Sequence, residues 1–278
     1  MSKIFTRTFR VRWGELDPSG TVGPANYLRY LIETAWDWGT AIGWGMDYSQ
    51  NPDVFWVIRE TEIRFLRPLR HNDVFDFTIW MVNWQRVRGT RCFELKLKES
   101  GDVVALGTQQ VVYMDTKTGR PTNLAEEEVA RFRMENPRVF PFERFPRIAK
   151  AEAPFTMQRQ VESMDLDVYE HVNNVIYFNY AEEAVLQDFS ARGWTPAKLG
   201  EANLTLAMRR VHIQYLSIAS WGETLNISTH MLDAKDTGGS RYVGMTRADG
   251  SPVAECIMDW ELVDRKSGEA RPLPDALR

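Results

Sequence analysis

The chain of 278 residues repeats itself at a constant offset. The segment VRWGELDPSGTVGPANYLRYLIETA, which starts at Val11, aligns with VESMDLDVYEHVNNVIYFNYAEEAV, which starts at Val161, at a shift of 150 (161 − 11). The same shift pairs further residues along both copies, among them Glu15 with Asp165, Asp17 with Asp167, Tyr27 with Tyr177, Glu33 with Glu183 and Ile63 with Ile213. The sequence therefore holds two copies of one unit of roughly 120 to 130 residues.

Each copy has the same pattern of apolar residues. A strand is expected at 5–13 and at 155–161, followed by a polar loop. Apolar residues then recur at helical spacing: Leu28, Leu31, Ile32 and Ala35 in one copy, and Phe178, Ala181 and Val185 in the other. Alternating apolar residues follow, for example over 75–81, 93–97 and 211–215, which is typical of antiparallel strands with one buried face. The pattern predicts an α+β fold in which a sheet wraps around one long helix, twice.

A segment of different composition separates the two copies. It contains an expected surface helix at 124–132 and then the proline-rich stretch PRVFPFERFP. We therefore expect an N-terminal domain over 1–120, a linker with a short helix over 121–153, and a C-terminal domain over 154–278.

Composition excludes several classes of function. The net charge is −4, the pI is about 5.7, and no run of Lys and Arg indicates a nucleic-acid partner or a charged membrane surface. The first residues lack the apolar core of a signal peptide, and no apolar run is long enough for a membrane helix, so we expect a cytoplasmic protein. Cys92 and Cys256 lie far apart and predict packed thiols rather than a metal or disulfide site. No metal or organic cofactor is implied.

Two short segments resemble known families. WGELDPSGTVGPANYLRY, from Trp13, resembles the signature of the 4-hydroxybenzoyl-CoA thioesterase family, whose hotdog domains have an acidic pair, D-P-x-G-x-V and then N-Y at the helix start. DLDVYEHVNN, from Asp165, is similar to the D-L-D-V-N-x-H-V-N-N signature of the acyl-ACP thioesterases, which are tandem hotdogs of about this size. The resemblance implies two hotdog domains and hydrolysis of an acyl thioester carried by CoA or by acyl carrier protein (ACP). It leaves the pairing of chains into a homo-oligomer open.

The residues themselves suit this chemistry. Thioester hydrolysis needs a group that attacks or activates water, and donors that stabilise the negative charge on the carbonyl oxygen. A carboxylate just before a helix can do the first, and unpaired N–H groups at the helix start can do the second. The candidate catalytic residues are Asp167, His171, Asn173, Asn174 and Asp17, and the candidate substrate-binding residues beside them are Tyr169, Asn26, Tyr27 and Tyr177.

The two loops differ in one decisive position. In the resemblance to the benzoyl-CoA family, the polarising amide belongs to the residue seven after the catalytic Asp, which is Asn174 in the second copy and Pro24 in the first. Proline has no N–H, although it is well suited to start a helix. We therefore expect the loop 165–174 to be the working site. Asp17 then belongs either to a second active site or to an N-terminal half of the protein that shapes the acyl pocket without being catalytic itself.

Other readings of the same residues stay open. Tyr169 stands where the acyl-ACP family has Asn, and Ile218 where it has Glu, which fits an acyl-thioester binding module that has kept the fold and lost turnover. An Asp or Asn before a helix is also a common turn or cap residue. A hotdog hydratase is disfavoured because no His follows Asp17-Pro18. Glu33 and Glu183 lie on the expected helices, where a solvated or paired face is the default.

Overall fold

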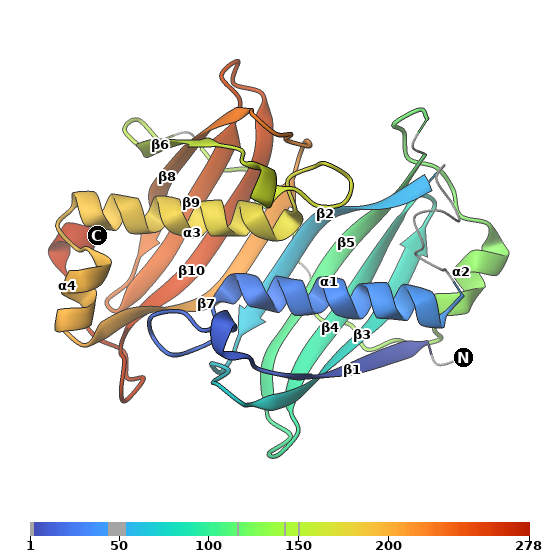
Figure 1. The fold of residues 1–278 in the computed structure, drawn as a ribbon, viewed down its shortest axis with the longest axis horizontal. Helices are drawn as coiled ribbons and strands as arrows, with labels where there is room; N and C mark the ends of the chain where they lie inside the picture. Colours follow the sequence, from blue (N-terminus) through green and yellow to red (C-terminus); the bar gives the residue numbers. More distant parts are fainter. Residues whose placement is uncertain (1–2, 44–53, 116, 142, 150) are drawn as a thin grey trace. The chain divides into compact units, whose positions relative to one another are not determined.

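The computed structural model describes residues 3–43, 54–115, 117–141, 143–149 and 151–278. The chain divides into two compact units, Met1–Glu143 and Arg144–Arg278. The division falls inside the predicted linker, which contains α2 (Glu126–Phe132) and, among its described residues after α2, no further helix or strand. Each unit has its own long helix and its own set of antiparallel strands (Figure 1).

The N-terminal unit is an antiparallel sheet with a long helix across one face. Its elements are β1 (Ile4–Arg10), η1 (Trp13–Glu15), α1 (Pro24–Ala41), β2 (Val54–Phe65), β3 (Val74–Gln85), β4 (Arg88–Leu97), β5 (Val103–Asp115) and α2. The strands lie in the order β1-β3-β4-β5-β2, and every neighbouring pair is antiparallel. In Figure 1, α1 runs across these strands.

The C-terminal unit repeats this arrangement. Its elements are β6 (Phe155–Gln160), η2 (Ser163–Asp165), α3 (Asn174–Ala191), α4 (Pro196–Glu201), β7 (Leu204–Tyr215), β8 (Thr224–Ala234), β9 (Gly238–Thr246), β10 (Pro252–Asp264) and η3 (Asp275–Leu277). The strand order β6-β8-β9-β10-β7 is that of the first unit, again antiparallel throughout. The predicted α+β class, with one sheet around one long helix in each copy, is confirmed. The short helix α4 was not predicted.

Aromatic and aliphatic side chains join each helix to its sheet. Tyr27 on α1 contacts Phe65 edge to face with 5.0 Å between ring centroids. On α3, the residues predicted from helical spacing are all buried, with Phe178, Ala181 and Val185 at most 4% exposed. Burial of such side chains stabilises the fold by roughly 1.5–3 kcal/mol each. These contacts hold the start of each helix, and the loop before it, in a fixed position on the sheet.

Both cysteines are fully buried in their sheets. Burial raises the pKa of the Cys92 thiol, so this group stays protonated and packs as a small apolar side chain. Among the tryptophans, Trp38, Trp80 and Trp260 are buried, whereas Trp13 and Trp221 are exposed.

Candidate active site

The loop between η2 and α3 forms a tight turn that presents Asp167. The Asp167 N–H donates to the His171 carbonyl at 2.9 Å, and the Glu170 N–H donates to the Asp167 carbonyl at 3.0 Å. Glu170 closes this turn with φ of 60°, a left-handed conformation that costs a non-glycine residue free energy. The corresponding residue of the first copy is Gly20, with φ of 79°. The turn is thus the same in both units, but only the first uses the residue that adopts it freely.

The connection between β7 and β8 fixes the loop from the other side. The Val172 N–H donates to the Ala219 carbonyl at 3.0 Å, and His171 forms an isolated bridge with Ser220. The Asn173 N–H donates to the Asp165 carbonyl at 2.9 Å. The backbone of the loop is therefore fixed before and after the residues that the sequence indicates as catalytic.

The Asp167 carboxylate is half-buried and only partly engaged. Its Oδ1 accepts the Tyr169 N–H at 2.9 Å, which is a turn commonly made by Asp. Among the described residues, its Oδ2 accepts no hydrogen bond, and the half-buried His171 imidazole likewise makes none. One carboxylate oxygen and one imidazole in the same turn therefore remain available to water or a ligand.

The start of α3 leaves one backbone donor open. Asn173 is the N-cap, and its Oδ1 accepts the Val175 N–H at 3.0 Å. The Ile176 N–H donates to the Asn173 carbonyl at 2.8 Å. In the part of the chain that the structure describes, the Asn174 N–H has no acceptor. Asn173 thus has a structural role as the cap, while Asn174, the first helical residue, presents the unpaired amide.

The N-terminal loop has the same frame with different polar groups. Asp17 Oδ1 accepts both the N–H and the hydroxyl of Ser19, and the position of His171 is taken by Thr21. Helix α1 begins with Pro24 after the N-cap Gly23, whose position has no side chain to cap the helix. This loop lacks both an imidazole and an N–H at the first helical residue.

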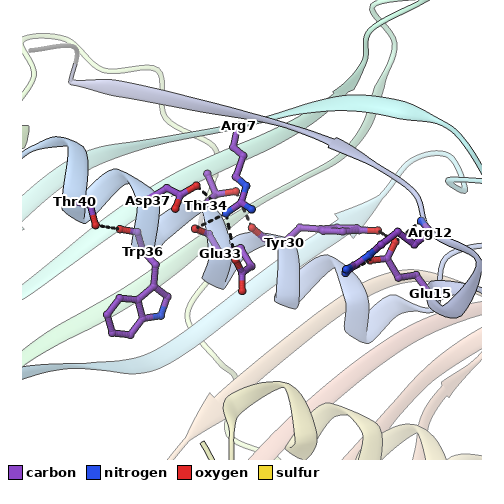
Figure 2. Close-up of polar contacts among 9 residues, drawn as sticks. All are labelled: Arg7, Arg12, Glu15, Tyr30, Glu33, Thr34, Trp36, Asp37 and Thr40. Carbon is purple, nitrogen blue, oxygen red and sulfur yellow. Dashed lines mark hydrogen bonds and ion pairs between the residues drawn. The ribbon is translucent and has the colours of Figure 1, made fainter. Parts of the chain in front are cut away.

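A buried carboxylate and a tyrosine support each loop, a feature that sequence reasoning did not assign. The Tyr30 hydroxyl donates to Glu15 Oε2 at 2.6 Å, and the Tyr180 hydroxyl donates to Asp165 Oδ2 at 2.6 Å. Figure 2 shows Tyr30 reaching toward Glu15, with the Arg12 side chain on the same carboxylate. The signal was present in the repeat, because both members of the pair are matched at the shift of 150.

The predicted substrate-binding residues occupy different environments. Tyr27 and Tyr177 are each 3% exposed, and their hydroxyls accept the backbone N–H of Leu69 and Ala219 at 3.2 and 3.0 Å. Burial raises the pKa of Tyr177 to about 12, so it remains a neutral phenol. Both tyrosines thus join a helix to the neighbouring turn. Asn26 is half-buried and donates to the Glu15 carbonyl at 2.9 Å, and Tyr169 is half-buried beside Asp167.

The helix glutamates lie on exposed faces. Glu33 pairs with Arg7 at 3.2 Å, as drawn in Figure 2, and Glu183 accepts the Gln187 amide at 2.8 Å. Within the described ranges, no group of three or more His, Cys, Asp or Glu side chains is arranged to hold a metal ion. Over the same ranges, no helix combines the length and apolar character needed to span a bilayer.

The fold and the duplicated loop define a double hotdog protein, and comparison with solved structures agrees. An acyl-ACP thioesterase from Bacteroides thetaiotaomicron superposes with a TM-score of 0.76 at 19% identity, covering 94% of this chain and 100% of that one. The 12:0-ACP thioesterase from Umbellularia californica gives 0.78 at 20% identity, covering 94% of each chain. These likenesses confirm the predicted tandem hotdog fold.

The chain belongs to the thioesterase-like superfamily, whose model matches residues 11–133 and 161–278. Among curated relatives, the long-chain acyl-CoA thioesterase FadM of Escherichia coli is 27% identical over 125 residues, which are 44% of this chain and 92% of FadM. A chloroplastic dodecanoyl-[acyl-carrier-protein] hydrolase of Cinnamomum camphora is 24% identical over 195 residues, 66% of this chain. The chain spans about half the length of that relative, 51%. The resemblance stated from the sequence is confirmed.

Proposed function

We propose that the protein hydrolyses acyl thioesters to a free acid and a thiol, and that the loop 165–174 is its active site. The observation that carries this proposal is the combination, at one turn, of an Asp167 oxygen and an Asn174 N–H that have no partner among the described residues. The names of the relatives, acyl-ACP and acyl-CoA thioesterases, support the reaction class. We propose that the acyl group is carried by CoA or by ACP, and that the protein works in the cytoplasm.

Asp167 and His171 would supply the proton chemistry. As general base, the Asp167 carboxylate takes a proton from water while the water oxygen attacks the thioester carbon. As nucleophile, it would form an anhydride that water then opens. In the first route the C–S bond breaks and the departing sulfur takes the proton that Asp167 received from water. In the second route the C–S bond breaks as the anhydride forms, so the sulfur takes its proton from a protonated His171 imidazole, and the water that later opens the anhydride returns a proton to that imidazole. Asp17, with Oδ1 bound to Ser19, is proposed as part of a half that serves binding.

The amide of Asn174 would stabilise the oxyanion. It lies at the first position of α3, where the helix dipole also favours negative charge. In subtilisin, loss of one such donor costs about 10²–10³ in kcat. The equivalent residue of α1, Pro24, starts that helix without an N–H. The first copy therefore gives a natural comparison for this role, because its equivalent residue cannot donate a hydrogen bond to an oxyanion.

Thiol release from a panel of acyl-CoAs and acyl-ACPs tests the reaction. Asp167→Asn should lower turnover at least tenfold, and Asp17→Asn should lower it much less. Asn174→Pro should lower kcat by roughly 10² while leaving α3 folded, since proline is tolerated at the first helical position. Asn174→Ala, which keeps the N–H, is its control. Binding of acyl thioesters without turnover would instead establish the non-catalytic binding module.

A further inference from the structure

Arg91 stands on the helix-facing side of the N-terminal sheet, which also carries aromatic side chains. It lies two residues from Phe93 on β4, so both side chains project from the same face. Phe93 stacks on Phe77 with 5.5 Å between ring centroids. On the same face of β3, Phe75 contacts Tyr30 of α1 at 5.0 Å. The Arg91 guanidinium therefore faces the interior between sheet and helix.

A row of polar groups crosses the sheet at the level of Arg91. Arg91 Nε donates to Gln109 Oε1 at 2.8 Å, and Gln109 Nε2 donates to Thr61 Oγ1 at 2.9 Å. Gln109 and Thr61 are 1% exposed. Among the described residues no carboxylate pairs with Arg91, and its Nη1 donates to none of them. The amide of Gln109 holds one edge of the guanidinium and leaves the other edge unused.

The C-terminal unit has the same arginine with its charge balanced. Arg241, at the shift of 150 from Arg91, is 1% exposed and forms an ion pair with the buried Asp188 of α3. In α1 the position of Asp188 is taken by Trp38, whose buried indole N–H has no partner. One unit thus neutralises its interior arginine with its own helix, and the other does not.

Arg91 keeps accessible surface on the helix-facing side of the sheet. Burial lowers the pKa of Arg91 to about 10, because the charged guanidinium is partly desolvated. Its side chain is nevertheless only half-buried. Two residues before Arg91 on β4, Gly89 is covered by Trp84 of β3, and Trp84 contacts Trp56 with 5.3 Å between ring centroids. A cation with accessible surface, on a sheet face that also carries aromatic rings, suits a ligand that is apolar except for one oxygen-bearing group.

We propose that the interior of the N-terminal unit binds an acyl group that ends in a carboxylate, and that Arg91, held by Gln109, recognises this carboxylate. A cation without a counter-ion in an apolar interior is costly, and a carboxylate meets the planar fork of arginine with two hydrogen bonds. The carboxylate of the ligand would neutralise Arg91, as the Asp188 carboxylate neutralises Arg241. The inference rests on the proposed thioester hydrolysis for its substrate class, but not on which loop is catalytic.

Paired substrates test this recognition. The ratio of kcat/KM for suberoyl-CoA, with a terminal carboxylate, to that for octanoyl-CoA, of equal length, should be at least ten for the wild-type chain. Arg91→Met should bring the ratio near one by slowing suberoyl-CoA, and Arg91→Lys should give an intermediate value. Arg88→Met, which removes an exposed arginine from the same strand, should leave the ratio unchanged. A wild-type preference for octanoyl-CoA or ω-hydroxyoctanoyl-CoA overturns the proposal.

Binding separates this proposal from the proposed reaction. Isothermal titration of the wild-type chain with non-hydrolysable thioether analogues of the same two substrates should show at least tenfold tighter binding of the suberoyl form. This measurement needs neither turnover nor a folded variant. Preferential binding without hydrolysis would reject the reaction and keep the carboxylate site, whereas hydrolysis with equal binding of the two analogues would reject the carboxylate site alone.

Discussion

The Tyr180 hydroxyl donates to Asp165 Oδ2 at 2.6 Å, and the Asp165 carbonyl accepts the Asn173 N–H at 2.9 Å. The same tyrosine therefore fixes the carboxylate side chain whose backbone holds the cap of α3. Tyr30 and Glu15 form the matching pair in the N-terminal unit, with the same 2.6 Å distance. Because each unit has its own tyrosine–carboxylate hydrogen bond, the contribution of this bond to each loop can be tested separately.

Tyr180→Phe should destabilise the protein by about 1–3 kcal/mol, because it removes a donor from a buried carboxylate. It should also lower kcat more than KM changes, since the loop loses its position rather than a substrate contact. Tyr30→Phe is the matched control and should cost similar stability with a smaller loss of kcat. Urea unfolding and thiol-release kinetics measure both effects. Equal losses of kcat in the two variants would contradict the assignment of the C-terminal loop as the active one.

Glu15 should make stability depend on pH in the acidic range. Burial acts to raise its pKa, but hydrogen bonds from Tyr30 and from the Arg12 backbone and side chain outweigh burial and leave the pKa below its usual value. A carboxylate whose folded pKa is lowered stabilises the fold above the unfolded value, about 4.3, and this stabilisation is lost as pH falls through the folded value.

The change that tests this linkage is Glu15→Gln. The difference in unfolding free energy between wild type and variant should be largest at pH 7 and should shrink below about pH 4, where the unfolded carboxyl becomes protonated. Urea titrations at several pH values measure it. A difference that stays constant from pH 7 to pH 3 would show that the charge of Glu15 contributes nothing.

The N-caps of the two long helices should respond in opposite directions. Asn173→Ala should cost about 1 kcal/mol, because the Val175 N–H loses its acceptor. Gly23→Asn should stabilise by a few tenths of a kcal/mol, roughly the known difference between these caps. Gly23 has φ of −60°, and an added Cβ would come no closer than 3.7 Å to the Asn26 amide. Thermal unfolding of both variants checks this, and a loss of stability in Gly23→Asn would refute it.

The repeat in the sequence was enough to predict the fold, since each apolar pattern was seen twice and both copies could share one architecture. It also indicated the turn at Asp167 and the pair Asn173 and Asn174 near the start of the helix, because polar residues before a helix have few conformations available. It did not reveal that Tyr177 binds the Ala219 N–H, 42 residues away. Contacts of this kind depend on the register between helix and sheet, which side-chain periodicity does not specify.

The interior ion pair was missed for the same reason. Asp188 and Arg241 are 53 residues apart, and each alone looks like an ordinary surface residue of a helix and a strand. A comparison of the copies gives one hint, because Asp188 replaces Trp38 on an otherwise apolar helix face. A charged residue in one copy, at a position that the other copy fills with tryptophan, indicates from the sequence alone that the charge is buried and paired.

Asp188 and Arg241 should show strong coupling in a double-mutant cycle. Asp188→Leu alone should cost about 3–5 kcal/mol, because it leaves the fully buried Arg241 without its counter-ion, and Arg241→Met alone should cost a similar amount. The double variant Asp188→Leu with Arg241→Met should lie close to wild type, since apolar groups of similar size replace the pair without desolvating a charge. Arg192→Ala is the control, because Arg192 binds the same carboxylate at 3.0 Å from a partly exposed position and should cost less than about 1 kcal/mol. Urea unfolding of the four variants measures the coupling, and additive losses would mean that the two charges contribute independently.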